Sequence, residues 1–171
     1  MKKVLIAVDE TEGSKSVLSV FQNMVRPPES VVLVHVQNLQ GKSMMVDMLS
    51  DSELDTIRES IEGTEYKEAL DRKSEKILNF YRKELENGGL VSVKTVVRTG
   101  VASEEILKIA QEEGVDLIVT GYNGKSFMQR MVTGSISKDI EKNAPVPVLV
   151  AKNPTAEEKY AWTSASAVGV K

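Results

Sequence analysis

The sequence predicts a three-layer α/β sandwich around a five-stranded parallel sheet, and two observations support this prediction. Short, nearly continuous apolar runs rich in β-branched residues recur along the chain, as expected for strands buried on both faces. Helical patterns lie between these runs, so that strands and helices alternate. Because crossovers between parallel strands are right-handed, the strand order 3-2-1-4-5 is the natural candidate.

The expected elements follow one another from the N-terminus. The strands are VLIAV (4–8), VVLVHV (31–36), VSVKTVV (91–97), DLIVTG (116–121) and VPVLVA (146–151). The helix after the first strand has an apolar face made by Ser16, Val17, Val20, Phe21 and Met24, and a longer helix before the third strand has one made by Tyr66, Leu70, Ile77, Tyr81 and Leu85. We also expect Phe80 to pack beside Tyr81. Shorter helices around 106–110 and 136–144 complete the alternation.

Two segments fall outside this alternation. Residues 38–62 form a long polar connection with a cluster of methionines, and Ser52 to Asp55 suit the start of a short helix. A long connection is usually functional or disordered. The methionines fit a flexible lid or a partner surface, and local packing under a loop explains them equally well. Residues 153–171 are weakly patterned, so we assign the domain to residues 1–152 and expect a mobile C-terminal tail.

Composition argues against several classes of function. The 171 residues include 22 basic and 25 acidic ones, giving a net charge of −3, which argues against binding to nucleic acid or an anionic membrane. With no cysteine and one histidine, thiolate chemistry, multi-histidine metal sites and histidine-based triads are not expected. We expect the histidine, His35, to be a hydrogen-bonded core or edge residue rather than a catalytic one. No apolar stretch suits a signal peptide or a membrane span, so we expect a cytoplasmic protein.

Glycines and hydroxyl residues gather between the fourth expected strand and the last helix. Gly121 comes at the carboxyl end of the strand, where open α/β sheets bind ligands. Gly134 and Ser135 then open the helix, with Ser137 in its first turn. Free N–H groups at a helix N-terminus favour anions, and the nearby Lys125 adds positive charge. This stretch therefore predicts a phosphate site.

A carboxylate is expected opposite the glycine stretch. Asp9 follows the first strand, and strands one and four are neighbours whose connections leave in opposite directions in the predicted order. Asp9 and the glycines therefore face one crevice at the topological switch point. An acid on one side and an anion cradle on the other suit a nucleotide, with Asp9 towards the base or ribose and Gly134-Ser135 towards phosphate.

Purely structural explanations of the same residues stay open. Asp9 would also serve as an N-cap of the first helix. Gly124 and Gly134 would also serve turns and close packing. Ser135 and Ser137 would cap the last helix, which is compatible with phosphate binding, and Lys125 would be a solvated charge.

The spacing Gly121-x2-Gly124-x9-Gly134-Ser135, with Asp9 after the first strand, resembles the nucleotide-binding pattern of the universal stress protein family. The ending NAPVPVLVAK at 143–152 is also typical of this family, and the resemblance covers residues 1–152. It implies a Rossmann-like adenine-nucleotide-binding fold with ATP or AMP as ligand. It also implies a homodimer that pairs through the strand at 146–151.

The resemblance further implies individual contacts. Ala7, Val8 and Asp9 would frame adenine, and the backbone at Val36 would meet the base. The residues bordering ribose and phosphates would be Gly121, Tyr122, Asn123, Gly124 and Lys125, and those binding phosphates would be Gly134, Ser135, Ile136 and Ser137.

Two positions depart from the family pattern, because Glu10 and Tyr122 stand where the family usually has small residues. Glu10, with Glu12 following, would repel phosphate unless turned away. Tyr122 would stack on the ribose or crowd it.

These features imply a dimeric, regulatory adenine-nucleotide-binding module of the stress response, which acts on an unknown protein partner through a nucleotide-dependent population shift. The alternative is a weak ATPase or phosphotransfer enzyme. That chemistry needs metal, a positioned nucleophile and charge clamps, and Glu10 and Glu12 would hold Mg²⁺ only through phosphates. No base or arginine clamp is recognisable, so we expect at most slow ATP hydrolysis. A phosphoacceptor receiver and a dinucleotide oxidoreductase fit poorly, because no aspartate ends the third strand and no glycine fingerprint follows the first.

Overall fold

The computed structural model describes residues 1–10, 12–37, 50–89, 92–122 and 136–152. In these ranges the strand order is the predicted one, β3-β2-β1-β4-β5, and every neighbouring pair is parallel. The predicted α/β fold class is therefore confirmed. The strands are β1 Lys3–Ala7, β2 Ser30–Gln37, β3 Val93–Thr99, β4 Leu117–Gly121 and β5 Val148–Ala151, and the helices are α1 Glu12–Met24, α3 Asp51–Ile61, α4 Glu65–Asn87, α5 Ala102–Glu113 and α7 Ile136–Asn143.

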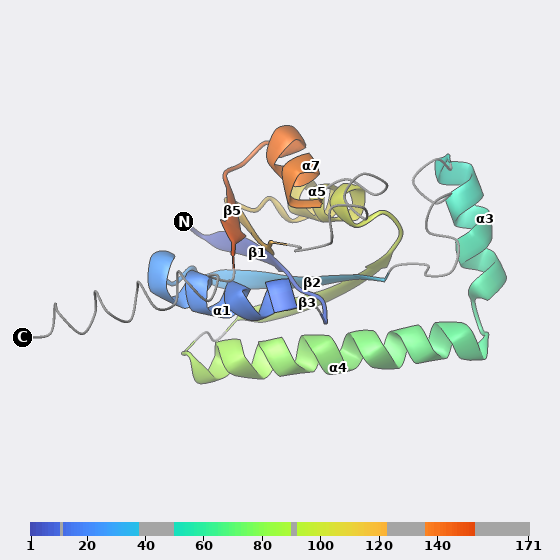
Figure 1. Ribbon diagram of the computed structural model, residues 1–171, viewed down its shortest axis with the longest axis horizontal. Coiled ribbons are helices and arrows are strands. Elements are labelled where there is room, and N and C mark those ends of the chain that lie inside the picture. Colours follow the sequence, from blue (N-terminus) through green and yellow to red (C-terminus); the bar gives the residue numbers. More distant parts are fainter. Residues whose placement is uncertain (11, 38–49, 90–91, 123–135, 153–171) are drawn as a thin grey trace, which may run out of the picture.

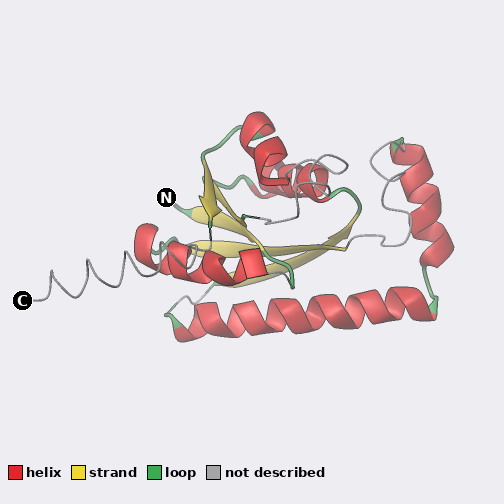
Figure 2. Ribbon diagram, viewed as in Figure 1, coloured by secondary structure: helices red, strands yellow, loops and turns green. Residues whose placement is uncertain are grey.

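Helices cover both faces of the sheet, with α1 and α4 on one side and α5 and α7 on the other (Figure 1). Figure 2 shows the same three layers, with the yellow strands between the red helices. Successive side chains of β1 alternate between the two apolar cores: Val4 and Ile6 lie in the core under α1 and α4, whereas Leu5 and Ala7 lie in the core under α5 and α7. Burial on both faces is the reason the strand is apolar from Val4 to Ala7.

Two apolar side chains expected on helix faces, and the neighbouring Phe80, lie outside these cores. Met24 ends α1 and Tyr66 lies in the first turn of α4, and both are exposed. Phe80 is 57% exposed and meets Tyr81 edge-on, with 5.1 Å between ring centroids. Neighbouring helical residues point about 100° apart, so Tyr81 faces the sheet and Phe80 does not. Phe80 therefore packs beside Tyr81, as expected, but it remains outside the core.

The two edges of the sheet differ in chemistry. The third strand runs from 93 to 99 rather than from 91 to 97, and its edge carries two basic residues that pair with α5. Lys94 bonds to Glu113, and Arg98 bonds to Glu112 at 2.9 Å. The opposite edge, β5, begins at Val148 rather than at 146 and has only the apolar side chains VLVA. Charged edge strands resist pairing with another chain, so β5 is the more open of the two edges.

The long connection contains the short helix that its sequence predicts. α3 covers Asp51–Ile61, whereas residues 38–49, with the methionine cluster, lie outside the described residues, as does the tail at 153–171. In the part of the chain that the structure describes, no helix combines the length and the apolar character that crossing a membrane requires.

Candidate functional site

The carboxyl ends of β2, β1 and β4 lie side by side at the carboxyl end of the sheet. Ala7 pairs with Val34 on one side and with Thr120 on the other. The Val8 N–H donates to the Val34 carbonyl at 2.9 Å, so the ladder continues past β1. Because the strand order reverses between β1 and β4, the carboxyl ends of these two strands form the topological switch point of the sheet. The structure brings together six of the predicted site residues here, namely Ala7, Val8, Asp9, Val36, Gly121 and Tyr122.

Asp9 is fixed by a serine in the first turn of α1. The Asp9 N–H donates to Ser14 Oγ at 2.9 Å, and the Ser14 hydroxyl donates to Asp9 Oδ1 at 2.8 Å. A hydroxyl can accept and donate at once, so the two residues form a closed hydrogen-bonded pair. Ser14 is buried and Asp9 is half-buried. Sequence reasoning missed Ser14, although a hydroxyl five residues after the acid was a visible signal.

His35 stabilises the same strand end from β2. Its Nδ1 lies 3.0 Å from the carbonyl oxygen of Val8, and the ring is buried. Because a carbonyl only accepts, Nδ1 carries the proton in this contact. The prediction of a hydrogen-bonded core histidine is confirmed.

Glu10 is turned towards α4. Its carboxylate accepts a hydrogen bond from Lys73 Nζ at 2.6 Å. Burial acts to raise the pKa of Glu10, but the hydrogen bond from Lys73 and a backbone hydrogen bond, together with the nearby positive charge, outweigh it and lower the pKa. A lysine on α4 therefore neutralises one of the two acids that would repel phosphate. The side chain of Glu12 lies outside the described residues.

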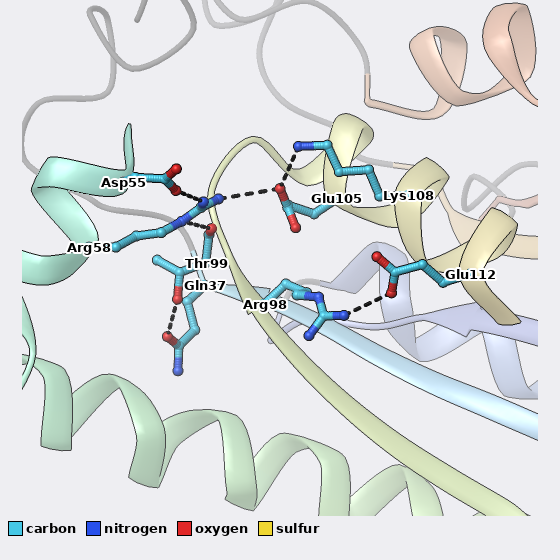
Figure 3. Close-up of polar contacts among 8 residues, drawn as sticks. All are labelled: Gln37, Asp55, Arg58, Arg98, Thr99, Glu105, Lys108 and Glu112. Carbon is cyan, nitrogen blue, oxygen red and sulfur yellow. Dashed lines mark hydrogen bonds and ion pairs between the residues drawn. The ribbon is translucent and has the colours of Figure 1, made fainter. Parts of the chain in front are cut away.

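Gln37, the residue after Val36, holds the end of β2 in place through side-chain hydrogen bonds. Gln37 donates from Nε2 to Asp71 Oδ1 at 2.8 Å and to Ser74 Oγ at 2.9 Å, both on α4. Its Oε1 accepts from the Thr99 hydroxyl at 2.8 Å, as Figure 3 shows. These bonds join β2 to α4 and β3 directly beside the predicted base contact at Val36.

At the end of β4, Tyr122 is held against the end of β5. Its N–H donates to the carbonyl of Ala151 at 2.6 Å. Lys152 Nζ lies 5.2 Å from the centroid of the Tyr122 ring, which is within the range of a cation–π contact. Lys152 thus places positive charge at this edge, and sequence reasoning did not identify it.

The predicted phosphate side is only partly described. α7 begins at Ile136, which packs against the core under α5 and α7, and Ser137 is buried in its first turn. The remaining predicted residues, namely Asn123, Gly124, Lys125, Gly134 and Ser135, lie outside the described residues.

A doubly wound parallel sheet with polar groups gathered at its switch point defines an open α/β fold, the class in which ligands commonly bind at that point. Residues 1–152 match the profile of the universal stress protein family. Universal stress protein MJ0577 of Methanocaldococcus jannaschii is 31% identical over 157 residues, which cover 88% of this chain and 94% of that protein. The chain belongs to the universal stress protein family.

Solved structures share the fold. The structure of MJ0577 superposes with a TM-score of 0.65 at 28% identity, covering 91% of this chain and 98% of that chain. A universal stress protein family protein of Arabidopsis thaliana, solved with AMP bound, superposes with a TM-score of 0.60 at 20% identity, covering 92% of this chain and 95% of that chain.

Proposed function

We propose that the protein is a cytoplasmic, dimeric regulatory module of the stress response that binds ATP or AMP where β1 and β4 diverge. The observation that carries this proposal is the placement of Asp9, which Ser14 holds at the switch point of a universal stress protein fold. The AMP bound to the plant protein supports the ligand class, although at 20% identity that likeness extends to the fold alone.

The proposed contacts divide between two sides of the crevice. Ala7, Val8, Asp9 and the backbone of Val36 would frame the base. Gly121, Tyr122, Asn123, Gly124 and Lys125 would border the ribose and phosphates, and Gly134, Ser135, Ile136 and Ser137 would bind the phosphates, with any Mg²⁺ held through the phosphate oxygens. Residues 1–152 would form this domain, with 153–171 appended as a tail.

The pairing of Glu10 with Lys73 favours this proposal. A free carboxylate one residue beyond Asp9 would oppose a polyanion. The Lys73 ammonium, 2.6 Å from Glu10 Oε1, offsets that charge and draws the side chain towards α4. The departure at position 10 is therefore compatible with phosphate binding.

Dimerisation through β5 is proposed from the chemistry of its backbone. Ile118 and Tyr122 donate to the carbonyls of Pro147 and Ala151, so alternate residues of this strand point their peptide groups towards β4. The peptide groups of Val148 and Val150, in between, point to the open edge. An apolar strand with outward N–H and C=O groups suits pairing with a second copy.

Two measurements test ligand binding. The protein is purified without added nucleotide and denatured, and the released small molecules are identified by mass spectrometry. AMP, ADP and ATP are then titrated by calorimetry, with and without Mg²⁺. Asp9→Asn should weaken binding by about 10-fold or more, since a hydrogen bond to a charged group is lost, whereas Glu84→Ala, at an exposed position of α4, should not.

Recovery of no nucleotide and absence of binding heat for all three nucleotides would refute the proposal. ATP turnover is measured in parallel, in the wild type and in Gly134→Val. Robust turnover that the variant abolishes would replace the regulatory interpretation with an enzymatic one.

A further inference from the structure

α3 stands at the end of α4, away from the body of the sheet (Figure 1). Among the described residues, its hydrogen bonds with the sheet and α5 come from a single side chain, Arg58, while Asp51 adds an electrostatic attraction to Lys108 of α5. We propose that α3 is an arm that opens separately from the rest of the domain, and that Arg58 is the latch that keeps it docked. This inference does not depend on which ligand the crevice binds.

The latch joins three elements through one guanidinium, as Figure 3 shows. Arg58 donates from Nε to the carbonyl oxygen of Thr99 at 2.8 Å, at the end of β3. Its second terminal nitrogen lies 3.3 Å from Glu105 Oε1 on α5, and its first bonds to Asp55 of its own helix at 2.7 Å. A planar fork with five donors can hold such divergent acceptors, whereas the point charge of lysine cannot.

Glu105 makes the latch energetically significant. Its side chain is only 8% exposed, and its carboxylate is shared between Arg58 and Lys108, which bonds at 3.2 Å. A buried carboxylate that loses one of its cations is strongly disfavoured. Undocking of Arg58 is therefore resisted by the cost of leaving Glu105 with one cation fewer, as well as by the loss of the hydrogen bond to Thr99.

The acceptor of the latch at the end of β3, Thr99, is itself held by hydrogen bonds. The Thr99 hydroxyl is bound to Gln37, and the Gly100 N–H donates to the Gln37 carbonyl at 3.2 Å. Gly100 has φ +150, and a Cβ there would lie 2.7 Å from the Arg58 guanidinium. Glycine thus leaves the space that the arginine occupies. Because Gln37 follows Val36, the latch closes directly beside the predicted base contact.

The arm itself is weakly integrated. Among the described residues, neither apolar core includes a side chain of α3, and its one apolar anchor is Leu54, which is 3% exposed. α3 carries its own N-terminal cap, in which the Ser50 N–H donates to Glu53 Oε2 at 2.8 Å. It joins α4 through a turn at Gly63, where φ is +74. A helix this short is marginally stable alone in water, so its protection depends on docking.

Amide hydrogen exchange read by mass spectrometry tests the latch on the full chain. In Arg58→Ala, amides of α3 should exchange about 10- to 100-fold faster, as expected for the loss of charge-assisted hydrogen bonds. Exchange in β1 and β4 should stay at the wild-type rate. Alanine favours helix more than arginine does, so faster exchange cannot come from lower intrinsic helix propensity.

Two further variants sharpen the test. Arg58→Lys keeps the charge but loses the fork, and should open α3 almost as much as alanine does. Glu59→Ala, on an exposed position of the same helix, is the matched control and should leave exchange unchanged. Unchanged α3 exchange in Arg58→Ala would overturn the latch, and faster exchange that is uniform over the whole chain would overturn the separate opening of the arm.

Discussion

Replacing Gln37 by methionine is expected to lower the free energy of unfolding by about 2–3 kcal/mol. The Gln37 side chain is 2% exposed, and its amide makes hydrogen bonds with Asp71, Ser74 and Thr99. Methionine has a similar length and volume, so it removes the amide without leaving a large cavity. Each net hydrogen bond contributes about 1 kcal/mol, and a buried group left unpaired costs about 1–3 kcal/mol.

The three partners differ in what the change costs them. Ser74 is 1% exposed and loses its donor, but its hydroxyl still donates to the Leu70 carbonyl at 2.9 Å, so its penalty is only partial. Asp71 is exposed and Thr99 is half-buried, so water replaces much of what they lose. The total therefore lies well below the sum of three full penalties.

Urea unfolding followed by circular dichroism measures the effect. The midpoint should fall while the denaturant slope stays unchanged, which identifies a loss of stability rather than a change in unfolded-state compactness. Gln111→Met, on the exposed surface of α5, is the matched control and should change stability by less than about 0.5 kcal/mol. If Gln37→Met is as stable as this control, the network at the end of β2 does not stabilise the fold.

Three other predictions concern separate parts of the molecule. Because the pKa of Glu10 is lowered, its pairing with Lys73 stabilises the fold fully above the ordinary pKa of 4.5, and this stabilisation is lost as pH falls through the lowered pKa. Lys73→Met should therefore lower the free energy of unfolding more at about pH 7 than at about pH 3. An equal loss at both pH values would contradict this. Val150→Pro removes an outward N–H of β5 and should yield monomers in analytical ultracentrifugation, whereas Thr95→Pro in the opposite edge strand, β3, should not. Dimers in both variants would show that the interface does not lie at β5. Ser14→Ala should weaken nucleotide binding, and combining it with Asp9→Asn should cost less than the sum of the two single changes; strict additivity would separate Ser14 from Asp9.

Local patterns in the chain were sufficient for the architecture. A strand buried on both faces is apolar at most positions, and a helix on a sheet repeats its apolar residues every three to four positions. These signals lie within single segments, and the alternation of segments then restricts the strand order. The gathering of Asp9, Val36 and Tyr122 at the carboxyl end of the sheet follows from that order. The position of His35 inside an apolar strand indicates a buried, hydrogen-bonded ring.

Hydrogen-bond and ion-pair partners that are far apart in the chain could not be predicted from the sequence in the same way, because the packing of the elements in three dimensions determines them. Lys73 meets Glu10 across 63 positions of sequence, Thr99 meets Gln37 across 62, and Arg58 meets Glu105 across 47. Each polar group alone resembles any surface charge or amide. The rotation of α4 about its axis likewise decides that Tyr81 is buried and Phe80 is exposed, because both are aromatic and adjacent in the chain. Their environments depend on where helices dock on the sheet, which no single segment encodes.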